Sequence, residues 1–166
     1  TIYNKYYILP IFEHFKNDID RYVSEHGLNL TPDFQRGHVW NAKQQRDYVE
    51  FVLRGGNTGL VIYFNHPQWM HFHTPKEHEY SEFVIVDGLQ RLTALMKFLN
   101  NELAIFDGHY YKDFEDRCHI MDIKFNVNNL KTKKEVLTWY LEMNSGGTPH
   151  TDAELARVLE LLKKED

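Results

Sequence analysis

The sequence predicts a single domain of the α+β class, in which helices and short strands share one chain of 166 residues. Several segments carry apolar residues three and four positions apart, which indicates amphipathic helices. Short runs of β-branched and aromatic residues between them indicate strands. A chain of this length fits one domain, and a content of 42% hydrophobic residues is enough to build a core.

The helices are placed by this spacing and by residues that start or stop them. Gly27 is a natural stop for the first helix, and Asn41 is a favoured N-cap for the second. Thr151 caps the last helix, and Glu154, three residues on, completes a capping box. The expected helices are 11–26, 42–54, 89–99, 110–116, 133–143 and one that starts at 152.

The strands are placed by short apolar runs and by turn residues that bound them. Between the first two helices, residues 28–40 read as irregular, because Thr31 precedes Pro32 and is held in an extended conformation. Residues 66–81 read as a long connection or an exposed insertion. The expected strands are 3–9, 60–64, 82–86 and 119–127, with a turn and a further short strand within 100–108.

Charge and composition narrow the functional classes. The net charge of −5 disfavours a domain that binds DNA through the DNA phosphates, since such domains are usually basic. Any DNA contact must therefore be local, regulated or made by a partner. No apolar run approaches the length of a membrane span, and no signal peptide is evident, so we expect a cytoplasmic protein without membrane contact. The single cysteine, Cys118, reads as a buried thiol rather than a nucleophile.

The most informative segment is a strand that leads through an Asp-Gly corner into a helix. Val84–Val86 is β-branched and apolar, Asp87 and Gly88 form the corner, and Arg91 lies at the start of the helical pattern. A helix N-terminus offers N–H groups and the positive end of the helix dipole. The segment therefore points to phosphate or nucleotide chemistry.

Three segments, which we call the first, second and third boxes, occur in a recognisable order. They are Pro32-Asp33-Phe34-Gln35-Arg36 with Val39-Trp40, then Val86-Asp87-Gly88-Leu89-Gln90-Arg91-Leu92-Thr93-Ala94-Leu95, then Met143-Asn144-Ser145-Gly146-Gly147-Thr148 with Glu154-Leu155. In this order they resemble the DUF262 family, the N-terminal domain of GmrSD-type modification-dependent restriction enzymes within the ParB/sulfiredoxin fold superfamily. The resemblance spans roughly residues 28–160.

The resemblance implies a ParB/sulfiredoxin-like small mixed sheet flanked by helices, which binds a nucleoside triphosphate and Mg²⁺. In the family the second box is tied to nucleotide hydrolysis. The implied catalytic residues are Asp87, Gln90 and Arg91, with Asp87 also the candidate Mg²⁺ ligand. The implied nucleotide- and phosphate-binding residues are Gln35, Arg36, Gly88, Arg91, Thr93, Asn144, Gly146 and Gly147.

The chain departs from the family pattern at two places. Leu89 stands where the family has the first glutamine of its Asp-Gly-Gln-Gln-Arg box. This difference affects the prediction of nucleotide hydrolysis more than the prediction of nucleotide binding. Residues 149–152 replace an apolar-serine pair in the third box. We also find no HNH-like metal cluster, so we expect no DNA cleavage by the route of the family's C-terminal nuclease domain.

Each residue of the second box has a structural alternative beside its functional interpretation. Arg91 either forks two phosphate oxygens or forms an ion pair with Asp87 or a bond to a C-terminal carbonyl. Asp87 either holds Mg²⁺ or a metal-bound water, or caps the helix that follows, and both can hold. Gly88 allows the tight turn and a close approach of the backbone.

The first and third boxes have alternatives of the same kind. Gln35 and Arg36 form either a second polar edge of the nucleotide pocket, with Arg36 on the phosphates, or a surface loop. Trp40 packs on the core or stacks on a base. Residues 144–148 either cradle an anion with backbone N–H groups or make an ordinary turn between two helices.

The histidines between Asn65 and His109 also invite a zinc interpretation. His71, His73 and His78 lie close together in sequence. Zinc sites need three or four ligands in a defined geometry, and no cysteine joins these residues. A solvated or pH-sensitive loop is therefore the preferred interpretation.

Three functions remain in competition. The first is a domain that binds a nucleoside triphosphate and hydrolyses it, and that acts in DNA restriction, phage defence or counter-defence. The second is a phosphotransferase of the same fold, in which an acceptor hydroxyl replaces water. The third is a non-enzymatic module that binds DNA or a partner such as a nuclease or restriction subunit. A homo-oligomer is compatible with each of them.

Overall fold

A four-stranded mixed sheet organises the chain. The computed structural model describes residues 6–8, 12–35, 39–69, 80–114, 123–144 and 152–166. The strands are β1 (Tyr6–Ile8), β2 (Val61–Asn65), β3 (Val84–Asp87) and β4 (Lys124–Asn128). The helices are α1 (Phe12–His26), α2 (Ala42–Leu53), α3 (Leu89–Leu99), α4 (Lys133–Asn144) and α5 (Asp152–Lys164), with a short 3₁₀ helix η1 (Tyr111–Asp113).

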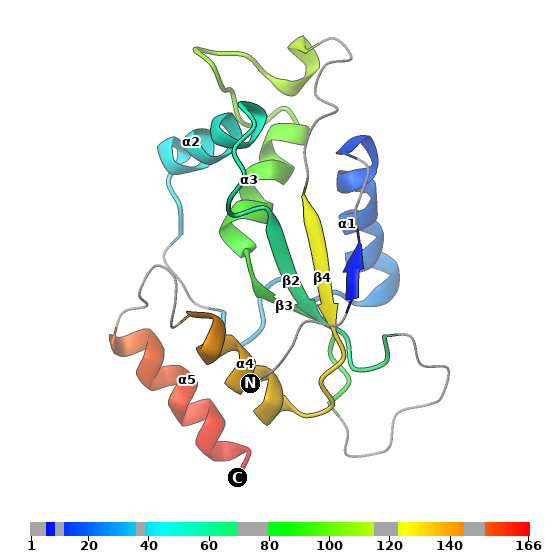
Figure 1. The fold of residues 1–166 in the computed structure, drawn as a ribbon, viewed down its shortest axis with the longest axis vertical. Coiled ribbons are helices and arrows are strands. Elements are labelled where there is room, and N and C mark those ends of the chain that lie inside the picture. Colours follow the sequence, from blue (N-terminus) through cyan, green and yellow to red (C-terminus); the bar gives the residue numbers. More distant parts are fainter. Residues whose placement is uncertain (1–5, 9–11, 36–38, 70–79, 115–122, 145–151) are drawn as a thin grey trace.

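The strand order is β1-β4-β2-β3. β4 and β2 are parallel, while β1 pairs with β4 and β3 pairs with β2 in antiparallel fashion. Figure 1 shows the α4–α5 pair at the lower end of the molecule and α1, α2 and α3 around its upper part. The β2–β3 pairing shifts register between Tyr63 and Phe64, and such irregularities locally increase the twist of a sheet.

The two faces of the sheet bury two separate sets of side chains, because successive residues of a strand point to opposite faces. On β3, Ile85 belongs to one set and its neighbours Val84 and Val86 to the other, and all three are fully buried. The first core cluster joins the sheet to α1, α2 and α3 and includes Phe15, Ile19, Val49, Val52, Ile62, Phe64, Ile85, Leu92, Leu95, Phe125 and Val127. The second core cluster joins β3 to α4 and α5 and consists of Phe34, Val84, Val86, Val136, Leu137, Trp139, Tyr140 and Val158.

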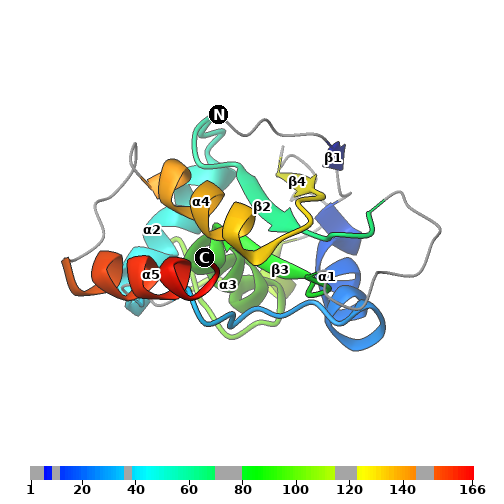
Figure 2. The same ribbon diagram turned by 90° about the horizontal axis from the view of Figure 1, so that it is seen from below.

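The outer edge of β3 is covered by the segment that follows α1. Asn29 forms a parallel bridge with Val84, in which its N–H donates to the Phe83 carbonyl at 2.8 Å and its carbonyl accepts from the Ile85 N–H at 3.3 Å. Figure 2 shows this segment passing along the sheet on its way from α1 toward α2. An edge strand with unpaired backbone groups is prone to pair with other chains. Asn29 provides hydrogen-bond partners for some of the backbone groups at that edge.

The α+β class and the small mixed sheet are confirmed. The helix predicted over 89–99 has those bounds, and Asn41 caps α2 through a capping box with Gln44. The helix predicted over 110–116 is a single 3₁₀ turn, and the short strand expected within 100–108 is an isolated bridge from Ile105 to His109. Thr151, the predicted cap of α5, lies outside the described residues.

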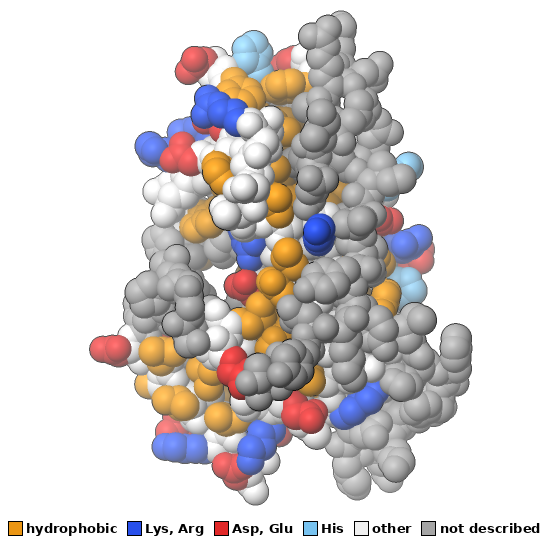
Figure 3. Space-filling model, viewed as in Figure 1, with side chains coloured by type: hydrophobic (Ala, Val, Ile, Leu, Met, Phe, Trp, Pro, Cys, Tyr) orange, Lys and Arg blue, Asp and Glu red, His pale blue; other side chains and the backbone are white. Residues whose placement is uncertain are grey.

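The described surface carries charges of both signs. Figure 3 shows acidic and basic side chains interspersed on one face, with hydrophobic side chains gathered toward its middle. Among the residues that the structure describes, no helix combines the length and the apolar character that a bilayer span requires.

Candidate functional site

The strand-to-helix corner is built on a left-handed glycine. β3 ends at Asp87, Gly88 adopts a φ of +100°, and α3 begins at Leu89. A Cβ atom on Gly88 would lie 3.2 Å from Nη2 of Arg91 and 3.3 Å from the side chain of Ile62. Glycine is therefore needed here both for the backbone conformation and for the close approach of these side chains.

Arg91 folds back over this corner. Its Nη2 donates to Oδ2 of Asp87 at 3.0 Å, and its Nη1 donates to the Val61 carbonyl at 2.8 Å. The exposed fractions of the two side chains are 17% for Arg91 and 37% for Asp87. The ion-pair alternative for Arg91 is thus present. The remaining N–H donors of the guanidinium are compatible with an anion beside Asp87.

Asp87 does not cap α3. Gly88 is the N-cap of α3, no side chain caps the helix, and the Asp87 carboxylate accepts from Arg91 instead. The N–H of Leu92 is the first to close a helical bond, to the Gly88 carbonyl. The N-terminal turn before it has the polarity that favours anions.

Three hydrogen bonds join the first box to the second box and to the residue that precedes it. Nε2 of Gln35 donates to the carbonyls of Val86, at 2.7 Å, and Ile85, at 3.3 Å. The backbone N–H of Trp40 donates to Oε1 of Gln90 at 2.9 Å. The two boxes, about 50 residues apart in sequence, therefore meet beside the corner.

Two aromatic side chains close this site on the α2 side. The ring of Trp40 lies 5.5 Å from that of Tyr48 and packs against the first core cluster. The Tyr48 hydroxyl donates to the Gly59 carbonyl at 2.7 Å. Burial raises the pKa of Tyr48 to about 12, while the charge of Arg91 acts to lower it. The packing interpretation of Trp40 is confirmed, and Tyr48 is a neighbour of Arg91 that the sequence did not reveal.

Comparison with known families places the chain in one of them. The sequence model described as the GmrSD restriction endonuclease, N-terminal domain, matches residues 12–119, which is more than half of the chain. The chain belongs to this family. The match includes the first and second boxes and ends before the third. No curated protein and no solved structure matches the chain.

Of the remaining site residues predicted for this GmrSD-type domain, the structure describes Thr93 and the position of Asn144. Thr93 lies two positions after Arg91, and side chains two apart do not share a helix face. Its hydroxyl donates to the Leu89 carbonyl at 2.8 Å. Asn144 ends α4, and Arg36, Gly146 and Gly147 lie outside the described residues.

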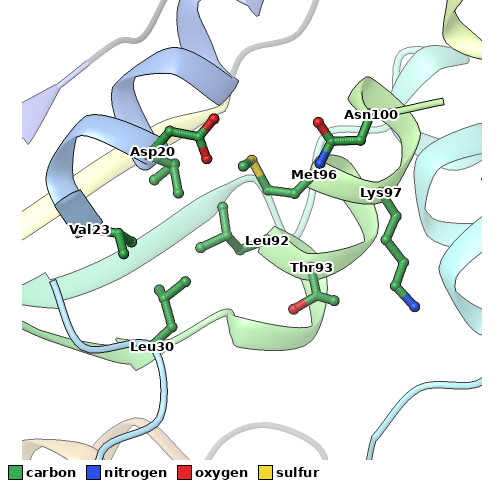
Figure 4. Close-up of a pocket in the computed structure, with 9 residues that line it drawn as sticks. Asp20, Val23, Leu30, Leu92, Thr93, Met96, Lys97 and Asn100 are labelled. Carbon is green, nitrogen blue, oxygen red and sulfur yellow. The ribbon is translucent and has the colours of Figure 1, made fainter. Parts of the chain in front are cut away.

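Thr93 instead lines a cavity between α1 and α3. The cavity has a volume of about 330 Å³. Figure 4 shows Leu92 and Met96 of α3 facing Val23 of α1 across it, with Asp20 and Asn100 at its rim. It is small and mostly apolar, at the lower end of ligand-site volumes, and it is separate from the Asp87–Arg91 corner.

Two residues, one on α4 and one on α5, contact Phe34 of the first box. Nη2 of Arg157 donates to the Phe34 carbonyl at 2.9 Å, and the Phe34 ring lies 5.1 Å from that of Tyr140. Burial, then the charge of Glu154, raises the pKa of Tyr140 to about 12, with a further contribution from Asp87. No motif pointed to Tyr140 or Arg157, because neither belongs to a recognisable box.

The candidate metal ligands in the sequence are Asp87 and three histidines. Within the described ranges, no group of three or more histidine, cysteine or acidic side chains is arranged to hold a metal ion. His71, His73, His78 and Cys118 lie outside those ranges. The partly exposed carboxylate of Asp87 suits Mg²⁺, because this ion is usually held by one or two carboxylates together with substrate phosphates.

Proposed function

We propose that this GmrSD-type domain binds a nucleoside triphosphate at the Asp87–Arg91 corner and hydrolyses it as part of DNA restriction. The observation that carries the proposal is the guanidinium of Arg91, which lies over Gly88 at the start of α3 with two of its donors fixed. A pre-oriented guanidinium at a helix N-terminus is a strong site for a phosphate group. A ParB/sulfiredoxin-like fold is part of the same proposal, supported by the small mixed sheet with helices on both faces.

In this proposal Arg91 binds phosphate oxygens and stabilises charge that develops on them. Asp87 would hold Mg²⁺, which when bound neutralises phosphate charge and orients the attacking water. Asp87 would at the same time keep the guanidinium of Arg91 in place through its 3.0 Å bond. Gln90 would fix the first box beside the phosphates, since its Oε1 already accepts from Trp40.

The experiment is isothermal titration of ATP, GTP, CTP and UTP into the protein with Mg²⁺, followed by a phosphate-release assay. Arg91→Lys keeps a positive charge but loses the planar fork, and Asp87→Asn keeps the size of the side chain but loses its charge. Both are expected to weaken nucleotide binding about ten-fold or more, as expected for charge-assisted hydrogen bonds.

Lys43→Gln provides a matched control. Lys43 forms an exposed ion pair with Asp47 on α2, and its loss is expected to leave nucleotide binding unchanged. Binding of no nucleotide by the wild-type protein would refute the proposal. Binding without phosphate release would favour transfer to an acceptor hydroxyl over hydrolysis.

A further inference from the structure

Arg157 of α5 makes a two-pronged contact with the backbone of the first box. Its Nη2 donates to the Phe34 carbonyl at 2.9 Å, and its Nη1 donates to the carbonyl of the preceding residue, Asp33. The planar guanidinium can bond two neighbouring acceptors at once, whereas the single ammonium of lysine cannot reproduce this fork. The contact joins segments 123 residues apart in sequence.

The same segment is also fixed by β3. The Gln35 N–H donates to the Pro32 carbonyl at 3.0 Å, which forms a tight turn. The Gln35 side chain then reaches the Val86 carbonyl at 2.7 Å, and Val86 is the residue before Asp87. Figure 2 shows the segment that follows α1 running past the sheet toward α5. Arg157 therefore joins the segment to α5, and Gln35 joins it to the strand that ends in Asp87.

We propose that Arg157 is a positioning residue for the nucleotide site. It holds residues 33–35 against the end of β3, and so sets the first box relative to Asp87 and Arg91. This inference rests on the proposed function, because it assigns to α5 a role in nucleotide affinity. Arg157 does not bind the nucleotide in this scheme and acts through Phe34 and Gln35.

Electrostatics couples the same elements. The pKa of Tyr140 is raised mainly by burial and by Glu154 of α5, is lowered by Arg157, and is raised further by Asp87. The charges of α5 and the carboxylate at the corner thus act on one phenol. Lys133 of α4 adds a 2.6 Å ion pair to Asp33, so the first box is held by α4, α5 and β3 together.

The competing explanation is that Arg157 only stabilises the packing of α5. Val158, the next residue, separates the two explanations because it is 1% exposed in the second core cluster and makes no contribution to the fork. Val158→Ala removes buried methyl groups and lowers stability while it leaves Arg157 in place. If Arg157 only stabilises the packing of α5, nucleotide affinity should fall together with stability when either Arg157 or Val158 is replaced.

The test uses Arg157→Gln, Arg157→Lys and Val158→Ala in the full chain. Urea unfolding gives the stability of each variant, titration of the nucleotide that the wild-type protein binds best gives its affinity, and amide hydrogen exchange is followed at residues 33–35 and 86–90. We expect Arg157→Gln to weaken binding about ten-fold and to speed exchange in both segments. Arg157→Lys should be intermediate, and Val158→Ala should be less stable with unchanged affinity.

Two results would overturn the inference. One is an Arg157→Gln protein that binds nucleotide as the wild type does, and the other is a Val158→Ala protein whose affinity falls as far as that of Arg157→Gln. If Arg157→Gln fails to fold, Arg157→Lys against Val158→Ala decides the question. A wild-type protein that binds no nucleotide refutes the proposed function itself, a result distinct from either of these.

Discussion

The backbone N–H of Trp40 donates a 2.9 Å hydrogen bond to Oε1 of Gln90. This bond joins the end of the first box to the first turn of α3. Gln90 therefore has a structural role in addition to the catalytic role that the family resemblance implies. The two roles depend on different properties of the side chain, so substitutions can separate them.

Gln90→Ala and Gln90→Glu are expected to differ in this way. Alanine leaves the Trp40 N–H without its acceptor and should lower the free energy of unfolding by about 1 kcal/mol, measured by urea denaturation. Glutamate still accepts this bond, so stability should stay near the wild type. Its negative charge beside the proposed phosphate site should nevertheless weaken nucleotide binding. Equal stability of the alanine variant and the wild type would contradict the structural role.

Gly88→Ala tests the corner itself. Alanine at a φ of +100° destabilises the folded state by about 1 to 2 kcal/mol, because its side chain disfavours the left-handed backbone conformation. It also forces Arg91 or Ile62 to move. Gly55→Ala is the matched control, because Gly55 has a φ of +87° with open space around its Cβ position. We expect Gly88→Ala to be the more destabilising of the two in urea unfolding, and equal losses would show that the close contact costs nothing.

The Asp87–Arg91 pair is expected to contribute measurably to stability without any ligand. A double-mutant cycle with Asp87→Asn and Arg91→Gln should give a coupling of roughly 0.5 to 1 kcal/mol, at the upper end for partly exposed pairs. The Lys43–Asp47 pair is its control, since its side chains are 74% and 56% exposed. A smaller coupling at Asp87–Arg91 than at this control would contradict the argument that burial strengthens the pair.

Local features of the fold were predictable because each depends on residues close in sequence. Apolar spacing predicted α3 with its observed bounds, and Asn41 marked the start of α2 because capping is a first-turn effect. The Asp-Gly corner is predictable in the same way, and the sequence allows the pairing of Arg91 with Asp87 as one of its two interpretations.

The long-range part of the site was not predictable in the same way. Arg157 reaches Phe34 across 123 residues, and nothing within α5 distinguishes this arginine from an exposed one. Tyr140 appeared only as one residue of a helical pattern, because its proximity to Asp87 depends on how α4 packs on β3. Thr93 was grouped with Arg91 by motif, although helix geometry turns the two side chains to different sides.

The stability of the protein should fall in alkaline solution because of its buried phenols. The pKa of Tyr140 is raised from 10.0 to about 12, chiefly by burial. A group whose pKa is higher in the folded state contributes stability that is complete below pH 10 and is lost as the pH rises toward about 12. Near pH 11 this amounts to about 1 kcal/mol for one such tyrosine, and Tyr48 adds a loss in the same direction.

Tyr140→Phe isolates this contribution. It lacks the ionisable hydroxyl, so the free energy of unfolding should decline less steeply than that of the wild type between neutral pH and about pH 11. Urea unfolding at a series of pH values measures the slope, and the comparison of slopes removes any constant cost of losing the hydroxyl. Parallel declines for Tyr140→Phe and the wild type would show that Tyr140 ionises alike in the folded and unfolded chains.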